Sequence, residues 1–238
     1  MNTELFLILS AGIFVGFYVQ TVVGFAGSLM ALPILLFKME LPDAIAYISI
    51  FYLFSSVFLI TKEWRNIDRN TIFQLAMASV VGVVLGTVVL MYSKPMVLKR
   101  ALGLFILVYV AYVLFGKGKI KLHKGGVLSF GVLAGFFSGL FSTGGPLYAI
   151  CVENTVKDVK VFRATMIGVF GLVTIARVPA LAVSGLLHVG HLKMTLLVLP
   201  IFLLAQFLGK RTFMKIEERL FKRSLMLLLC VSGVIMIF

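Results

Sequence analysis

Residues 24–29 read Gly24-Phe25-Ala26-Gly27-Ser28-Leu29 and lie, with Pro33, inside an uncharged segment of 33 residues from Leu5 to Phe37. A second uncharged segment, of 28 residues from Gly125 to Val152, contains Ser142-Thr143-Gly144-Gly145-Pro146-Leu147. Apolar segments interrupted by Gly and Pro at matching places in two halves of a chain are typical of the binding sites of secondary transporters. A broken helix exposes backbone N–H groups at membrane depth, which is tolerated only beside protein or a water-filled cavity.

The composition predicts an integral membrane protein in contact with the lipid bilayer. The chain is 61% hydrophobic and 13% charged, whereas charged residues make up about 25% of typical soluble domains. The 238 residues leave no room for a separate soluble domain. The net charge of +13 comes from basic residues in short loops between apolar segments. We interpret this charge as a determinant of membrane topology and not as a nucleic-acid-binding surface.

The charge-free windows predict an all-α polytopic membrane protein with two homologous halves in one membrane domain. The first half, 1–116, would hold a Gly-rich hairpin at 5–37 and spans at 44–61, 70–93 and 97–116. The second half, 117–238, would hold a hairpin at 125–152 and spans at 164–187, 194–209 and 221–238. A shift of 123 residues places Gly86 on Gly209 and Lys99 on Lys222, which indicates an internal repeat.

The Gly-rich segments leave two topologies open. A continuous helix of 33 residues would be about 50 Å long, against a hydrocarbon core of about 30 Å. Each segment is therefore either one span with a loose end or a re-entrant hairpin of two half-helices. Two hairpins divide the basic residues outside the spans into 16 and 5, and single crossings divide them into 13 and 8. The sharper asymmetry favours hairpins, which would make the two halves an inverted repeat with both termini on the non-cytoplasmic side.

The ordered motifs resemble those of the TauE/SafE family of sulfite and organosulfonate permeases. The first motif runs from Gln20 to Leu29 with Pro33, and the second from Gly135 through Gly139 to Leu147. The segment Val161-Phe162-Arg163-Ala164-Thr165 is also similar to the second half of that family. The first motif departs from the commoner Gly-Gly-Gly form. The resemblance implies a cell-membrane permease for sulfite, organosulfonates or related organic anions, working by alternating access between the two repeats.

Residues at the two Gly-rich motifs and one intramembrane arginine are the predicted anion-binding groups. A charge at membrane depth costs about 2.5–3.5 kcal/mol, so Arg177 indicates function, and its guanidinium can hold an oxyanion with two parallel bonds. Two alternatives remain open. In the first, the glycines serve only to allow close helix packing; in the second, Pro179 ends the helix and Arg177 snorkels or bonds the freed carbonyls. The predicted substrate-binding residues are Gln20, Thr21, Gly24, Gly27, Ser28, Ser142, Thr143, Gly144, Gly145, Pro146 and Arg177.

The remaining polar residues narrow the function. All nine acidic residues lie in loops or at span ends, which disfavours a cation carrier; of these, Glu153, with Asn154, is predicted to gate or to take a proton. We expect His188 and His191 to face a loop. No paired His/Glu motif, catalytic dyad or nucleotide-binding loop indicates an enzyme, a metal site or a cofactor. The coupling ion, proton or sodium, stays open. Small-residue faces permit a homodimer, and the alternative function is a non-transporting membrane subunit.

Overall fold

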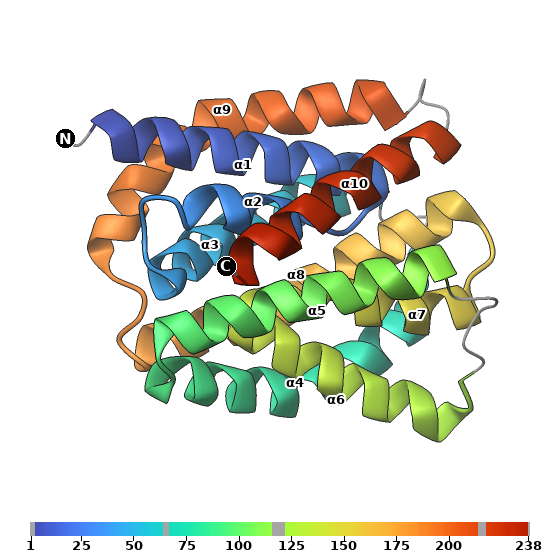
Figure 1. Cartoon of the computed structure of the whole chain (residues 1–238). Coiled ribbons are helices and arrows are strands. Elements are labelled where there is room, and N and C mark those ends of the chain that lie inside the picture. Colours follow the sequence, from blue (N-terminus) through green and yellow to red (C-terminus); the bar gives the residue numbers. More distant parts are fainter. Residues whose placement is uncertain (1–2, 64–66, 116–121, 214–217, 238) are drawn as a thin grey trace.

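The structure is a computed structural model that describes residues 3–63, 67–115, 122–213 and 218–237. These residues form ten α-helices and no strand (Figure 1), so the all-α prediction is confirmed. The helices are α1 (Thr3–Val23), α2 (Gly27–Leu35), α3 (Leu41–Glu63), α4 (Arg69–Tyr92), α5 (Pro95–Phe115), α6 (Lys124–Phe141), α7 (Gly145–Thr155), α8 (Val159–Val183), α9 (Val189–Phe213) and α10 (Glu218–Ile237).

Each Gly-rich segment forms a long helix, a break and a short helix. The first break carries two residues with positive φ, Gly24 at 92° and Ala26 at 68°, and the second carries Ser142 at 57°. These left-handed conformations end α1 and α6, because a helix cannot continue through them. The short helices α2 and α7 have nine and eleven residues, which makes them about 14 and 17 Å long. Each is therefore about half of a membrane span.

Both broken pairs fold back to the end of the bundle at which they begin. Glu4 in the first turn of α1 forms an ion pair of 2.8 Å with Lys38, just after α2. The N–H of Leu122, just before α6, donates to Asn154 Oδ1 in the last turn of α7, at 3.1 Å. In the view of Figure 1, α1 begins and α2 ends on the left, whereas α6 begins and α7 ends on the right. This is the hairpin geometry; the inverted repeat and the division at residue 116 stay predictions.

Among the described residues, five helices are long and apolar enough to cross a membrane: α1, α4, α5, α8 and α9. Shorter apolar stretches lie in α3 and α6. The outer surface of α4 is apolar, with Val81, Leu85 and Val88 each about half exposed, as expected for a helix that faces lipid. The chain is a multi-pass membrane protein. Residues 116 and 238, at which two predicted spans end, lie outside the described residues.

Glycines bring α4 and α6 into backbone contact. A Cβ added to Gly82 or Gly86 of α4 would overlap the backbone of α6, and one added to Gly135 or Gly139 of α6 would overlap the backbone of α4. Small residues at such spacing let membrane helices approach closely. This interface fixes α6 in place up to the last turn before the second break.

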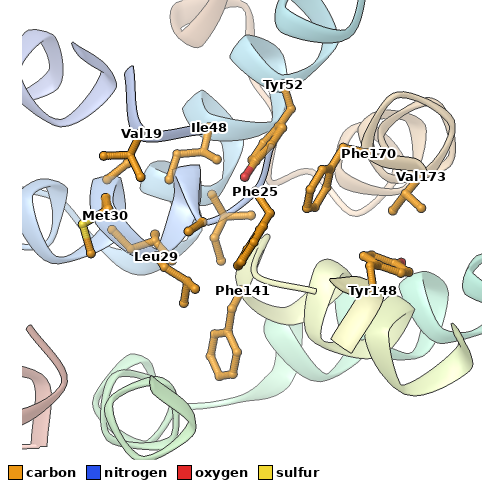
Figure 2. Close-up of a cluster of buried hydrophobic side chains, with 14 of the residues drawn as sticks. Val19, Phe25, Leu29, Met30, Ile48, Tyr52, Phe141, Tyr148, Phe170 and Val173 are labelled. Carbon is orange, nitrogen blue, oxygen red and sulfur yellow. The ribbon is translucent and has the colours of Figure 1, made fainter. Parts of the chain in front are cut away.

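A cluster of aromatic rings fills the centre of the bundle. The rings of Tyr52 and Phe170 lie 5.3 Å apart, and those of Tyr148 and Phe170 lie 5.9 Å apart. Figure 2 shows these side chains, with Phe25, between the two Gly-rich segments and α8, whereas the Phe141 ring points away from Phe170. The aromatic cluster therefore surrounds the region in which the two helix breaks lie.

Candidate functional site

The two helix breaks touch each other at the centre of the protein. The Ser28 hydroxyl donates a hydrogen bond of 2.5 Å to the Ser142 carbonyl. A Cβ added to Gly145 would lie 3.3 Å from Phe25 Cβ, so the backbones of the two segments are close there as well. We call residues 24–28 and 142–146 the junction. Contact between residues so far apart in sequence makes this a single site built from both segments.

Both short helices present their N-termini to the junction. α2 begins at Gly27, and the Ser28 N–H donates to the Tyr52 hydroxyl at 3.2 Å. α7 begins at Gly145, with Pro146 in its first turn. Proline is tolerated there because N–H groups of the first turn have no hydrogen-bond partner within the helix. The N-terminus of a helix carries a partial positive charge and free N–H groups. Two such ends in one place favour an anion.

Arg177 brings a formal positive charge to the same region. It is 1% exposed and lies in α8. Its Nη1 donates to the Ser138 carbonyl at 3.2 Å, its Nη2 donates to Thr174 Oγ1 at 3.4 Å, and its Cζ lies 5.4 Å from the centre of the Tyr52 ring. The carbonyl that it binds belongs to the last turn of α6, not to a turn freed by Pro179, since α8 continues to Val183. The idea that Pro179 ends the helix is therefore wrong.

Several buried polar atoms of this region lack a hydrogen-bond partner within the described part of the chain. They are both amide atoms of Gln20, the hydroxyls of Ser138, Ser142 and Thr143, and Nε of Arg177. A buried polar group without a partner costs about 1–3 kcal/mol. The hydroxyls of Ser10, Ser56 and Thr195 also lack one, so it is the grouping that distinguishes the site. A ligand that accepts hydrogen bonds would satisfy several of these donors at once.

Two glycines make room for these polar side chains. A Cβ at Gly27 would lie 2.8 Å from Gln20 Oε1. A Cβ at Gly144 would overlap the Ala134 carbonyl and lie 2.8 Å from Ser138 Oγ. Both distances are shorter than carbon and oxygen tolerate, so any larger residue would displace the polar group. Both glycines thus allow neighbouring groups to pack closely, as the alternative of close helix packing predicts. They do so next to the polar atoms that lack a partner.

Thr21 points away from the junction. Its hydroxyl lies 2.7 Å from the Phe17 carbonyl and 2.8 Å from Gln206 Oε1, and Gln206 Nε2 donates to Ser55 Oγ at 2.7 Å. These bonds tie α1 to α9 and α3 just before the first break. A substrate contact of Thr21 stays a prediction, although the structure places its hydroxyl among these structural bonds.

Arg163 is a buried arginine that lies just before the predicted span at 164–187. It lies in the first turns of α8, is 4% exposed, and donates from Nε to the Thr21 carbonyl at 2.8 Å. Gly24 packs against it, since an added Cβ would lie 3.2 Å from Arg163 Cα. In the sequence, Asp158 indicates that this helix begins before residue 164. Its side chain accepts hydrogen bonds from Lys160 N–H and Val161 N–H and caps the N-terminus of α8.

Glu153 and Asn154 lie outside the junction. Both are exposed in the last turn of α7, about 12 Å along the helix from its first residue. The Asn154 side chain accepts a hydrogen bond from the N–H of Leu122 and donates one to the Ile150 carbonyl at 2.8 Å. Its amide therefore links the ends of the second hairpin. Their gating role stays a prediction.

The ring of His191 contacts the loop residue His188, as expected, but it is also buried against α3, which was not expected. His191 lies in the first turn of α9, is 6% exposed, and pairs with Asp43 of α3 at 3.1 Å. Periodicity could not reveal this pair, because its members are far apart in sequence. Among the described residues, no group of three or more His, Cys, Asp or Glu side chains could hold a metal ion, and Cys151 and Cys230 are free thiols.

Comparison with known protein families gives a match over nearly the whole chain. The family model described as Sulfite exporter TauE/SafE matches residues 8–236. This range includes both breaks, the junction and all or most of every described helix, so the relation extends over nearly the whole chain. No curated protein and no solved structure matches the chain.

Proposed function

The chain belongs to the sulfite exporter TauE/SafE family, and on that basis we propose that it is a cell-membrane permease that binds small anions at the junction. The substrates we propose are sulfite, organosulfonates and related organic anions. The predicted residues at the two breaks, with Arg177, would form the binding site. Membership in a transporter family is consistent with the absence of a catalytic motif in the sequence.

The convergence of positive groups carries this proposal. The N-termini of α2 and α7 meet in a buried place next to Arg177. No acidic side chain is buried among the residues whose side chains are described. Because a low-dielectric surrounding strengthens each electrostatic interaction, this arrangement would stabilise an anion and repel a cation.

The unpartnered donors suit an oxyanion. The hydroxyls of Ser142 and Thr143, the amide of Gln20 and Nε of Arg177 would each donate to a sulfite or sulfonate oxygen. Hydrogen bonds from a guanidinium to an anion are shorter and stronger than neutral ones. An oxyanion with three oxygens can accept several of these bonds together, which would replace the water it loses on entering the protein.

The burial of the junction supports a mechanism of alternating access. Ser28, Ser142, Thr143 and Arg177 are all almost completely buried, so an anion would reach them only if helices move apart. The bond between Ser28 and Ser142 holds the two Gly-rich segments together. We propose that movement of one repeat against the other breaks this contact and opens the junction to one side of the membrane at a time.

Anion flux in proteoliposomes tests the proposal. Wild-type protein should give saturable flux of sulfite or a sulfonate, in competition with sulfate, sulfoacetate and simple carboxylates. Arg177→Ala should reduce this flux at least tenfold, and Arg177→Lys should reduce it less. Arg211→Ala is the matched control, because Arg211 is exposed on α9 and lies over the Phe207 ring, 4.3 Å from its centre.

Each result has a clear meaning. If folded protein carries no anion, the permease function is wrong and a non-transporting membrane subunit becomes the better explanation. If saturable flux is the same in Arg177→Ala as in Arg211→Ala, the permease function stands and Arg177 is not part of its site.

A further inference from the structure

A second polar site lies away from the junction. A pocket of about 520 Å³ opens at the end of the bundle where α1 begins and where the segment before α9 lies. Its titratable lining side chains are Asp43, Tyr47, His188, His191 and Lys193. None of these residues has a part in the anion site proposed above.

Two hydrogen bonds determine which nitrogen of the neutral His191 ring carries the hydrogen. The backbone N–H of His188 donates to Nδ1 at 3.0 Å, and Nε2 lies 3.1 Å from Asp43 Oδ1. Because Nδ1 accepts a bond, the single hydrogen of the neutral ring must be on Nε2, from which it donates to Asp43. The ring also packs edge-on against Tyr47, with centroids 4.8 Å apart, and stacks on His188 at 5.7 Å.

A proton added to this ring has only one place to bind. Nε2 already carries hydrogen, so a proton from water in the pocket would bind to Nδ1. Nδ1 would then be a donor that faces the N–H of His188, and the bond between them would be lost. The imidazolium would in turn form an ion pair with Asp43, across α3 and α9. Proton binding therefore exchanges a bond to the segment before α9 for a stronger contact between two helices.

The groups around the ring have opposite effects on such a cation. From α3, the Asp43 carboxylate favours it and the neutral Tyr47 has little effect. Lys193 on α9 and a protonated His188 on the preceding segment would oppose it. The other linings from α1 and from the segment after α2 are apolar, Leu5 and Met39. Of these four side chains, only the Asp43 carboxylate is hydrogen-bonded to the ring, at 3.1 Å, so its charge acts at the shortest distance.

The two helices joined at the pocket are joined again beside the first break. Gln206 of α9 donates to Ser55 of α3 at 2.7 Å and reaches the Thr21 hydroxyl at 2.8 Å. Thr21 is two residues before Val23, the last residue of α1. A change in the contact of α3 with α9 at His191 would thus be transmitted along both helices to the junction.

We propose that His191, paired with Asp43, is a proton-binding site filled from this pocket, and that proton occupancy controls anion movement through the contact of α3 with α9. The proposed control of anion movement rests on the function proposed above, whereas the proton-binding site does not. Imidazole is the side chain whose charge ordinarily changes between about pH 5 and 8, which suits it to this role.

Proton binding is tested on the protein itself, without transport. In ¹⁵N-histidine spectra of purified protein, the His191 signals, assigned with His191→Gln, should change from one protonated ring nitrogen to two as the pH is lowered from 8 to 5. The His188 amide should exchange with solvent faster in the same range, because it loses its acceptor. If the ring keeps one hydrogen and the exchange stays constant, the proton site is wrong.

Coupling is tested by flux with the pH set separately on each side of the vesicle. Wild-type flux should change at least threefold when the pH on the pocket side moves from 7.5 to 5.5. His191→Gln and Asp43→Asn should lose this dependence, and the exposed His123→Gln should keep it. An equal dependence in all four proteins would refute coupling. Absence of any flux, with the ring still titrating, would refute the proposed function and the coupling but not the proton site.

Discussion

The hydroxyl of Ser28 is the most informative single group to remove, because it joins the two helix breaks directly. It donates to the buried Ser142 carbonyl and lies 3.3 Å from the Tyr52 hydroxyl, which donates to it. Ser28→Ala would leave that carbonyl without its partner and Tyr52 without its acceptor. A buried group left unsatisfied costs about 1–3 kcal/mol. We therefore expect the free energy of unfolding to fall by about that amount.

Thermal unfolding of the purified protein measures this loss. For a chain of this size, about 1 kcal/mol corresponds to a shift in Tm of about 2–4 °C, so Ser28→Ala should unfold at least a few degrees below wild type. The matched control is Ser56→Ala, since Ser56 is also buried but its hydroxyl has no partner within the described residues. The control should change Tm little. Equal melting temperatures for the two variants would refute the claim that Ser28 holds the junction together.

Three further predictions concern the helices around the junction. Gly86→Ala would drive a methyl group into the backbone of α6 and should lower Tm by several degrees, whereas Gly125→Ala, with open space around its added Cβ, should not; equal Tm values would contradict the close contact of α4 with α6. Arg163→Lys loses the Nε bond to the Thr21 carbonyl and should cost about 1.5–3 kcal/mol, the range for a bond to a charged group, measured by chemical denaturation of detergent-solubilised protein. Gln206→Leu and Thr21→Val should not be additive in a double-mutant cycle of unfolding, because each removes the same bond; additive losses would show that this bond contributes nothing.

Local sequence signals predicted the positions of the helix breaks. Gly24 and the Gly144-Gly145-Pro146 run are residues that end or begin helices by their own backbone preferences, and the breaks lie at these residues. Arg177 stood out because a charge within an apolar window is rare, and its burial was therefore foreseeable.

The partners of polar side chains could not be predicted in the same way. Arg163 and His191 each lie near the end of an apolar window, where a charged or titratable residue usually faces water. Their burial depends on which helices pack against them: α1 and Phe213 for Arg163, and α3 for His191. The sequence carries no periodic signal for contacts of this kind, because each depends on two helices that are distant along the chain.

An α-helical membrane protein with two interrupted segments is predictable from the sequence, since hydropathy and the conformations of Gly and Pro act on neighbouring residues. The contact of the two interruptions, through Ser28 and Ser142, and the pairing of Asp43 with His191 are visible only in the folded protein. Side-chain hydrogen bonds act over about 3 Å. Whether two groups come within that distance depends on the packing of whole helices, which no local stretch of sequence encodes.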